Sequence, residues 1–119
     1  MADRSEAELV TEARARITEV TPADAIARCG AGDVLFLDVR EMNEWNLFRI
    51  PGATHLPIGA IAASAHGRVP RERDVIVYCN QGNRSVLATD LLRSMGYTRA
   101  SSLTGGVRAW MDAGGELED

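Results

Sequence analysis

Cys79 is the residue of this sequence that is best placed for nucleophilic chemistry. It follows the apolar run Val75–Tyr78 and opens a short polar segment, after which a helical pattern begins at once. The first amides of a helix have no intrahelical partner, so they can converge on a side chain at this position. Such a ring binds anions and favours the thiolate, the reactive form of cysteine. The pattern therefore predicts a nucleophile held in an anion-binding loop.

The six residues after Cys79 are the candidate binding residues. Gly82 can adopt a positive φ, which lets the backbone curl, and Arg84 is a permanent cation that can steady the loop or meet an anionic substrate. A buried, inert cysteine at a strand end is the alternative, but the glycine, the arginine and the helix start favour a reactive one. We expect the substrate-binding donors to be the backbone amides of Asn80, Gln81, Gly82, Asn83, Arg84 and Ser85.

Four stretches of the chain resemble, in the same order, the signatures of rhodanese-like sulfurtransferases. The segment 79–85 resembles the active-site loop Cys-x-x-Gly-x-Arg-Ser of that family. The other three are Asp38–Glu41 with Glu44-Trp45, Arg49–Ala53 with Leu56-Pro57, and Gly105–Trp110. The resemblance covers residues 18–115. One departure is local, because Phe48-Arg49 stands where the family often has Gly-His.

The resemblance implies a sulfurtransferase that moves sulfane sulfur from thiosulfate or a related donor to a thiol or cyanide. The Cys79 thiolate would attack the outer sulfur of thiosulfate, release sulfite and become a persulfide held by the loop amides. No metal or organic cofactor is required for this reaction. A noncatalytic sulfur-relay or binding module, which receives sulfur from a partner protein, stays open as an alternative.

The length of the loop bears on a further alternative, a phosphatase or arsenate reductase that uses the same cysteine. Four residues lie between Cys79 and Arg84. By resemblance, the related phosphatases and arsenate reductases have five, which makes a wider ring for a tetrahedral phosphate. The shorter ring favours sulfur and disfavours phosphatase activity.

Asp38 and Arg40 are candidates for a supporting role. Asp38 ends an apolar strand that we expect beside the strand of Cys79, so its carboxylate could hold Arg84 or cap a nearby loop. A plain strand-end cap or a solvated charge is an equal alternative. For Arg40, and for Glu41 and Glu44, structural ion pairs are favoured over a role in the site.

The remaining polar and aromatic candidates are expected to be structural. Trp45 and Trp110 should pack in or around the core, and Cys29 should be a small apolar residue of a helix. His55 lies on a short strand and has no evident catalytic partner. Because the histidines and cysteines show no ligand spacing, no metal site is predicted.

The apolar pattern predicts an α/β fold with three layers. Val34–Asp38 and Val75–Tyr78 are continuous apolar runs, typical of central strands in a parallel sheet that is covered on both faces. The family resemblance implies a five-stranded parallel sheet of order 1-5-4-2-3. The other expected elements are strands at 17–20, 100–103 and before residue 56, and helices from residue 21, over 85–95 and over 106–113, with 58–73 the least regular stretch.

The length of 119 residues fits one domain with one core. Ser5 and Glu8 have the spacing of a capping box, and apolar residues recur behind them at helical intervals. We expect residues 1–16 to form a helical extension and residues 17–119 to form the rhodanese-like domain.

The composition excludes several classes of function. Acidic residues outnumber basic ones by 17 to 13, and the basic residues are scattered, so neither nucleic acid nor a membrane surface is an expected partner. All 13 basic residues are arginine. The absence of lysine excludes Schiff-base chemistry, pyridoxal attachment and a phosphate-loop lysine.

The expected partners are therefore a small sulfur donor and a thiol or protein acceptor, and the expected state is a monomer or weak dimer. No apolar run approaches the roughly 20 residues that cross a bilayer, and the first residues lack a secretory pattern. A cytoplasmic location follows as the expectation. In a reducing compartment a disulfide between Cys29 and Cys79 is not expected.

Overall fold

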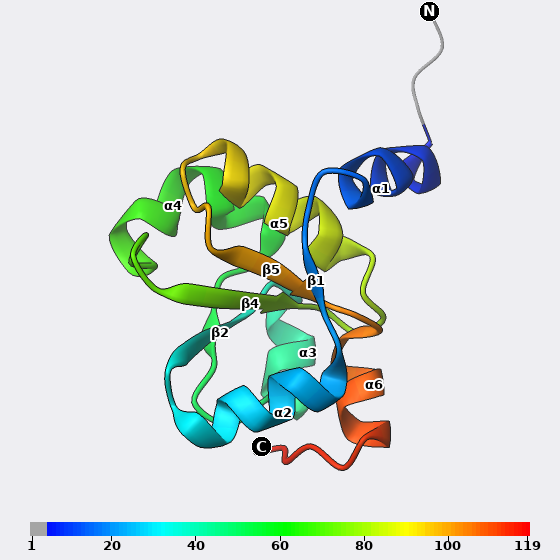
Figure 1. The fold of residues 1–119 in the computed structure, drawn as a ribbon, viewed down its shortest axis with the longest axis vertical. Coiled ribbons are helices and arrows are strands. Elements are labelled where there is room, and N and C mark those ends of the chain that lie inside the picture. The colour runs from blue at the N-terminus through cyan, green and yellow to red at the C-terminus, as the bar shows by residue number, and fades with distance from the viewer. Residues whose placement is uncertain (1–4) are drawn as a thin grey trace, which may run out of the picture.

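The structure, a computed structural model, describes residues 5–119 and contains one five-stranded parallel sheet (Figure 1). The strand order is β1-β5-β4-β2-β3, which confirms the predicted topology. The two apolar runs pair in the centre, with Val34 opposite Asp74 and Asp38 opposite Tyr78. The strands are β1 (Glu19–Val20), β2 (Val34–Asp38), β3 (Thr54–His55), β4 (Asp74–Tyr78) and β5 (Ala100–Leu103).

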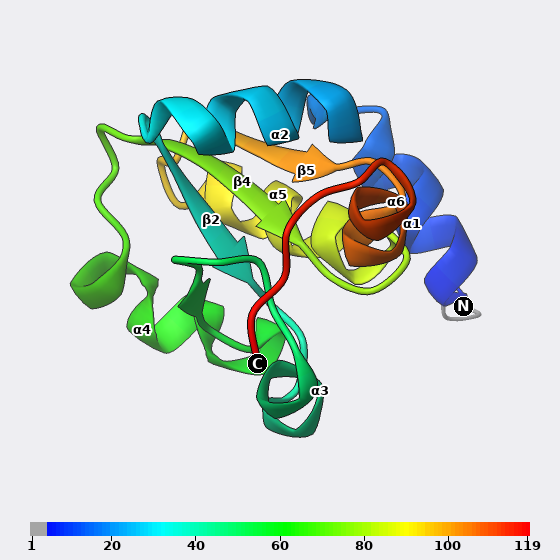
Figure 2. The same ribbon diagram turned by 90° about the horizontal axis from the view of Figure 1, so that it is seen from below.

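Helices cover both faces of the sheet and make the three layers that the sequence predicted. Helices α4 and α5 lie on one face, and α2 and α6 lie on the other, as the two views show (Figures 1 and 2). The helices are α1 (Glu6–Arg14), α2 (Pro22–Ala31), α3 (Met42–Leu47), α4 (Ile61–Arg68), α5 (Arg84–Ser94) and α6 (Gly106–Asp112), with a 3₁₀ turn, η1 (Ile58–Ala60), before α4.

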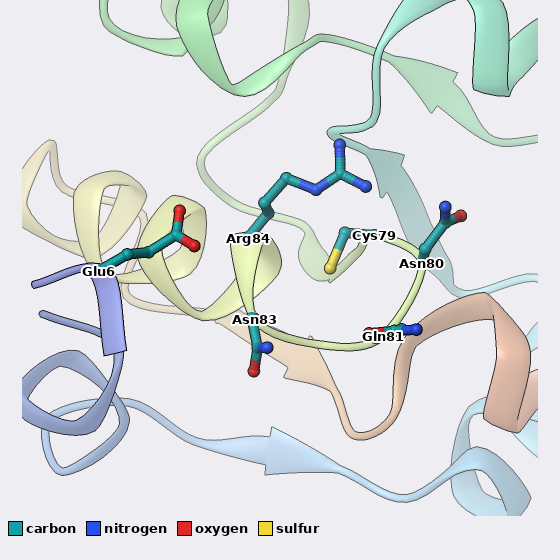
Figure 3. Close-up of a pocket in the computed structure, with 6 residues that line it drawn as sticks. All are labelled: Glu6, Cys79, Asn80, Gln81, Asn83 and Arg84. Carbon is teal, nitrogen blue, oxygen red and sulfur yellow. The ribbon is translucent and has the colours of Figure 1, made fainter. Parts of the chain in front are cut away.

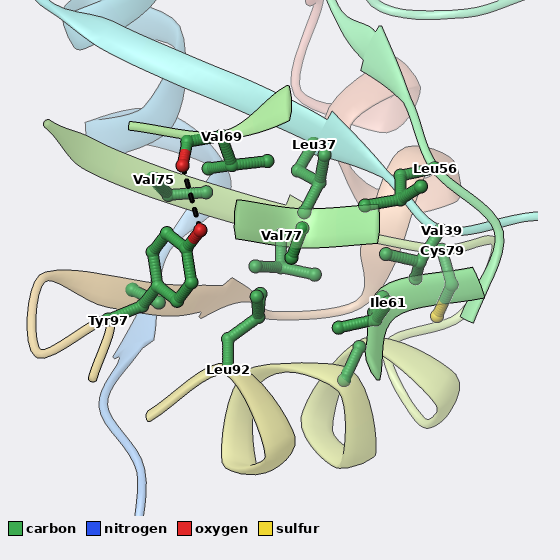
Figure 4. Packing of buried hydrophobic residues seen from close by; sticks show 13 residues of the cluster. Leu37, Val39, Leu56, Ile61, Val69, Val75, Val77, Cys79, Leu92 and Tyr97 are labelled. Carbon is green, nitrogen blue, oxygen red and sulfur yellow. Dashed lines mark hydrogen bonds between the residues drawn. The ribbon is translucent and has the colours of Figure 1, made fainter. Parts of the chain in front are cut away.

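The core is divided by the sheet into two apolar clusters. On the face of α4 and α5, Val77 packs with Ile61 and Leu92, and the hydroxyl of Tyr97 donates to the carbonyl of Val69 at 2.8 Å (Figure 4). On the opposite face, the rings of Phe36 and Trp110 meet edge to face with centroids 5.4 Å apart. Burial on both faces explains why the central strands have no polar alternation.

Helix α1 packs on the outside of α5. Its start is fixed by the expected capping box, in which Ser5 and Glu8 exchange backbone-to-side-chain hydrogen bonds of 3.1 Å. Val10 and Ala13 are buried against Val86 of α5. The first four residues of the predicted extension 1–16 lie outside the described part of the chain, and its boundary with residues 17–119 stays a prediction.

The sequence-based prediction was wrong for one stretch and incomplete for another. Residues 58–73, expected to be the least regular part, contain η1 and α4, since alanine favours a helix and Ile61 and Ala65 lie four residues apart on its buried face. Helix α3 was not predicted, because its six residues are too few to show a periodic pattern. Strand β1 is also shorter than the predicted range 17–20.

The chain end returns to the neighbourhood of α3 (Figure 2). Arg49 and Glu118 exchange two backbone hydrogen bonds of 2.9 Å, and the indole of Trp110 donates to the carbonyl of Glu116 at 2.7 Å. The Arg49 guanidinium lies 4.7 Å from the ring centre of Trp45. Arg49, at the departure from the family pattern, therefore joins the chain end to α3.

The described residues include no helix that is both long enough and apolar enough to cross a membrane.

A tight contact at the start of α6 generates the first prediction. Gly106 has φ +64°, and a Cβ there would lie 2.5 Å from the carbonyl oxygens of Cys79 and Asn80. We expect Gly106→Ala to lower the free energy of unfolding by about 2–4 kcal/mol, measured by urea denaturation. Gly67→Ala is the control, because it lies in α4 with open space around it and should change stability by less than about 1 kcal/mol. Equal effects of the two variants would contradict the close approach.

Candidate active site

Cys79 lies immediately after β4, and its sulfur points into the loop that leads to α5 (Figure 3). The Sγ atom accepts hydrogen bonds from the amides of Gly82 at 3.1 Å and Ser85 at 3.3 Å. The residue is only 2% exposed. Two amide donors directed at one sulfur stabilise negative charge on it, either as a thiolate or on a sulfur atom attached to it.

The buried hydroxyl groups of Ser85 and Ser102 lie on one side of the Cys79 sulfur. The Cys79 Sγ atom is 3.5 Å from Ser85 Oγ, which in turn lies 2.9 Å from Ser102 Oγ on β5. Both serines are completely buried. Ser102 therefore fixes the position of the hydroxyl that faces the Cys79 sulfur.

The backbone of the loop is held by the start of α6. The amides of Val107 and Arg108 donate to the carbonyls of Cys79 and Asn80, at 2.8 and 3.1 Å. Gly82 adopts φ +93°, and a Cβ there would lie 2.9 Å from the Gly105 nitrogen. The loop thus closes against a neighbouring backbone that leaves no room for a side chain at Gly82.

Arg84 is held by Glu44 of α3 and not by Asp38, which corrects one of the two roles suggested for Asp38. The guanidinium makes two hydrogen bonds of 2.9 Å to the Glu44 carboxylate. This pairing lowers the pKa of Glu44 to about 2, although desolvation opposes the shift. The Arg84 cation is therefore neutralised by a fixed partner.

Asp38 instead supports the site through Arg40. Its carboxylate accepts from the Arg40 backbone amide at 2.9 Å and from the guanidinium at 2.8 Å, and both side chains are buried. Arg40 Nη1 also donates to Asn80 Oδ1 at 3.2 Å. On the other side, Asn80 Nδ2 donates to Glu44 at 2.6 Å. The structural ion pair favoured for Arg40 is thus present, and it orients a loop side chain.

The loop opens into a hollow of about 320 Å³. The described residues that line it are Glu6, Cys79, Asn80, Gln81, Asn83 and Arg84, as Figure 3 shows. Sequence reasoning named all of these except Glu6, because helix α1 brings it there from more than 70 positions away. Ser102 and the partnership of Glu44 with Arg84 were missed for the same reason, since neither has a local sequence signal.

The other candidates take structural places. Trp110 is buried in the core, and Trp45 stacks on His55 with ring centres 4.8 Å apart. Cys29 and Cys79 are both free thiols. Among residues 5–119 no group of three histidine, cysteine or acidic side chains is arranged to hold a metal ion.

The sequence matches the family model of the rhodanese-like domain over residues 21–113, which include every element from the start of α2 to the end of α6. The chain belongs to the rhodanese-like domain family. The matched region contains Cys79 and its loop, Arg84, and the Glu44 that binds it.

Two curated relatives of this rhodanese-like domain are described as sulfurtransferases. An Allochromatium vinosum sulfurtransferase is 40% identical over 78 residues, which are 66% of this chain and 72% of the relative. The human thiosulfate:glutathione sulfurtransferase is 30% identical over 95 residues, covering 69% of this chain and 83% of the relative. Other relatives are longer, and the chain spans 40% of one from Bacillus subtilis and 25% of one from Mycobacterium tuberculosis.

Solved structures resemble the rhodanese-like domain over most of its length. A Rhodopseudomonas palustris protein of unknown function, described as a possible tyrosine phosphatase, has a TM-score of 0.88 and 31% identity, covering 99% of this chain and 97% of its own. The rhodanese-like domain of an Anabaena protein has a TM-score of 0.79 and 31% identity, covering 84% and 77% of the two chains.

The ion pair between Glu44 and Arg84 should make the free energy of unfolding depend on pH. The carboxylate stabilises the fold fully above its unfolded pKa of about 4.5, and this stabilisation is lost as the pH falls toward 2. Because the pair is partly solvated, we expect it to contribute about 0.5–1 kcal/mol at pH 6. Glu44→Gln should therefore lower the free energy of unfolding at pH 6, and its difference from the wild type should shrink by pH 3. Urea denaturation at several pH values measures this difference.

The matched control is Glu72→Gln, an exposed acid outside the loop, which should show no such pH-dependent difference from the wild type. A Glu44→Gln difference that stays constant from pH 6 to pH 3 would contradict the low pKa of Glu44.

Proposed function

We propose that this chain is a sulfurtransferase that carries sulfane sulfur as a persulfide on Cys79. The supporting observation is the position of Sγ, with two backbone amides directed at it from a loop that narrows around it. Thiosulfate or a related compound would be the donor, and a thiol or cyanide would be the acceptor. The sulfurtransferase relatives support the reaction class.

In the first step the Cys79 thiolate attacks the outer sulfur of the donor. With thiosulfate, a sulfur–sulfur bond forms to Cys79 while the bond between the two thiosulfate sulfurs breaks, and sulfite leaves with the electron pair. The persulfide retains one negative charge on its outer sulfur, next to the Sγ atom to which the amides of Gly82 and Ser85 donate. A well-placed donor of this kind contributes about 3 kcal/mol in oxyanion-type sites.

In the second step an acceptor thiolate or cyanide attacks the outer sulfur of the persulfide. The new bond forms to the acceptor, and the Cys79 thiolate leaves with its electron pair, restored to its starting position. The free enzyme is regenerated before the next donor binds. The two half-reactions therefore predict ping-pong kinetics.

The ring around Cys79 favours sulfur over phosphate. Only four residues separate Cys79 from Arg84, and the Arg84 guanidinium is already bound by Glu44 through two hydrogen bonds. A phosphatase would need that guanidinium to bind the phosphate oxygens. We therefore expect no hydrolysis of an aryl phosphate, although one structural neighbour is described as a possible tyrosine phosphatase.

Substitution of the nucleophile tests the proposal. Cys79→Ser should abolish sulfur transfer from thiosulfate to cyanide while leaving the far-ultraviolet circular dichroism and the melting temperature close to those of the wild type. Cys29→Ser is the matched control and should retain transfer, because Cys29 lies in α2, outside the hollow. Turnover retained in Cys79→Ser would contradict the proposal.

Intact-mass measurement separates the sulfurtransferase from a relay module. After exposure to a sulfane donor, the wild type should gain one sulfur atom that cyanide or a thiol removes, and Cys79→Ser should gain none. A wild-type adduct without multiple turnover would favour the relay module. No adduct with any small donor would contradict the sulfurtransferase and would favour a relay module that receives sulfur only from a partner protein.

A further inference from the structure

We propose that helix α1 makes the hollow selective for sulfur donors of low negative charge, so that a hydropersulfide, R–S–SH, is preferred to the thiosulfate dianion. This inference rests on the proposed function and concerns the donor that the same site uses. The proposed selectivity depends on Glu6, a residue of α1 that lies outside the loop 79–85.

The charge of the hollow argues for this preference. Of the described residues that line it, Arg84 is the cation and Glu6 is the acid. The other four are Cys79 and three residues with neutral amide side chains. Arg84 is occupied by Glu44, so these two charges cancel. Within residues 5–119, the Glu6 carboxylate then gives the entrance an excess of negative charge, which repels a dianion more than a monoanion or a neutral molecule.

Among the residues that the structure describes, two cations near the loop do not reverse this balance, because each has an acidic partner. Arg14 pairs with Glu19 at 3.2 Å, and Arg40 pairs with Asp38 at 2.8 Å. Arg108 lines the adjacent hollow together with Asp112. The amides of the loop act on Sγ itself, so they favour every donor that reaches the sulfur and do not distinguish the charge at the far end of the donor.

The fold holds Glu6 beside the hollow. Glu6 is the first residue of α1, and its side chain extends from that helix toward the side of Arg84 (Figure 3). The helix is anchored to α5 by Val10 and Ala13. At its other end, Arg14 Nη2 donates to the carbonyl of Gly82 within the loop, at 3.3 Å. The position of the carboxylate is therefore tied to the packing of α1 on the catalytic helix and loop.

The preferred first step is a balanced exchange. The Cys79 thiolate attacks the outer sulfur of R–S–SH, the bond between the two donor sulfurs breaks, and R–S⁻ leaves with the electron pair. The proton stays on the transferred sulfur, which gives Cys79–S–SH. No oxidant or reductant is consumed, and no charge greater than one has to pass Glu6.

The rate of sulfur loading tests the inference when three donors of different charge are compared. Thiosulfate carries two negative charges and methanethiosulfonate carries one. In cysteine hydropersulfide the ammonium and carboxylate charges cancel, and the S–SH group is neutral when it is protonated. Loading is followed by intact mass for the wild type, Glu6→Gln and Glu6→Lys. Glu72→Lys is the matched control, because it makes the same change of net charge before the amino end of β4, the opposite end of that strand from Cys79.

We expect Glu6→Lys to raise the second-order rate constant of sulfur loading about 3- to 10-fold with thiosulfate. With methanethiosulfonate the logarithm of the rate constant should rise about half as much. With cysteine hydropersulfide the rate constant should rise less than 2-fold. Glu6→Gln should give about half the logarithmic effect of Glu6→Lys. Added salt should reduce these differences. Glu72→Lys should leave all three rates within 2-fold of the wild type.

The outcomes separate the inference from the proposed function. If the wild type loads sulfur but Glu6→Lys changes all three rates equally or not at all, the charge selection by Glu6 is wrong and the sulfurtransferase stands. The same conclusion follows if the wild type loads thiosulfate faster than cysteine hydropersulfide. If no donor adds sulfur to Cys79, the proposed function itself fails.

Discussion

The carboxylate of Glu44 is the interaction on which the arrangement of the site depends. It binds the Arg84 guanidinium twice, the Asn80 amide and the backbone amide at the start of α3. These contacts tie both ends of the loop after Cys79 to one short helix. The carboxylate therefore sets the shape of the loop and also removes the charge of the cation that the loop contributes. One carboxylate thus affects both the conformation of the loop and the net charge beside Cys79.

A second constraint acts on the backbone of the loop. The Gly105-Gly106 pair at the start of α6 allows two amides to bind the carbonyls of Cys79 and Asn80. This contact leaves the amides of Gly82 and Ser85 free to face the sulfur. The loop is consequently held at its carbonyls from outside, while its donors are directed inward. The sheet makes this possible, because it places β4 beside β5, the strand that leads into α6.

The sequence predicted the features of the site that are local. The apolar runs identified the two central strands, and the segment 79–85 identified the loop because its strand end, glycine and helix start are contiguous. The strand order came from the family resemblance and not from the apolar pattern. Glu44, Ser102 and Glu6 could not be assigned their contacts in the same way, since each reaches the loop through tertiary packing. Helix α3 shows why, because six residues without a periodic pattern position the acid that binds Arg84.

The burial of Cys79 has a kinetic consequence for any sulfur that it holds. Because only 2% of the residue is exposed, a sulfur atom attached to Cys79 would be reached through the hollow that the loop lines. Its residence time would then depend less on its chemical reactivity than on the width of the molecules that approach it. Narrow nucleophiles could reach this sulfur through the hollow, whereas bulky reductants would not fit into it. Such shielding would allow a reactive sulfur to persist between its arrival and its delivery.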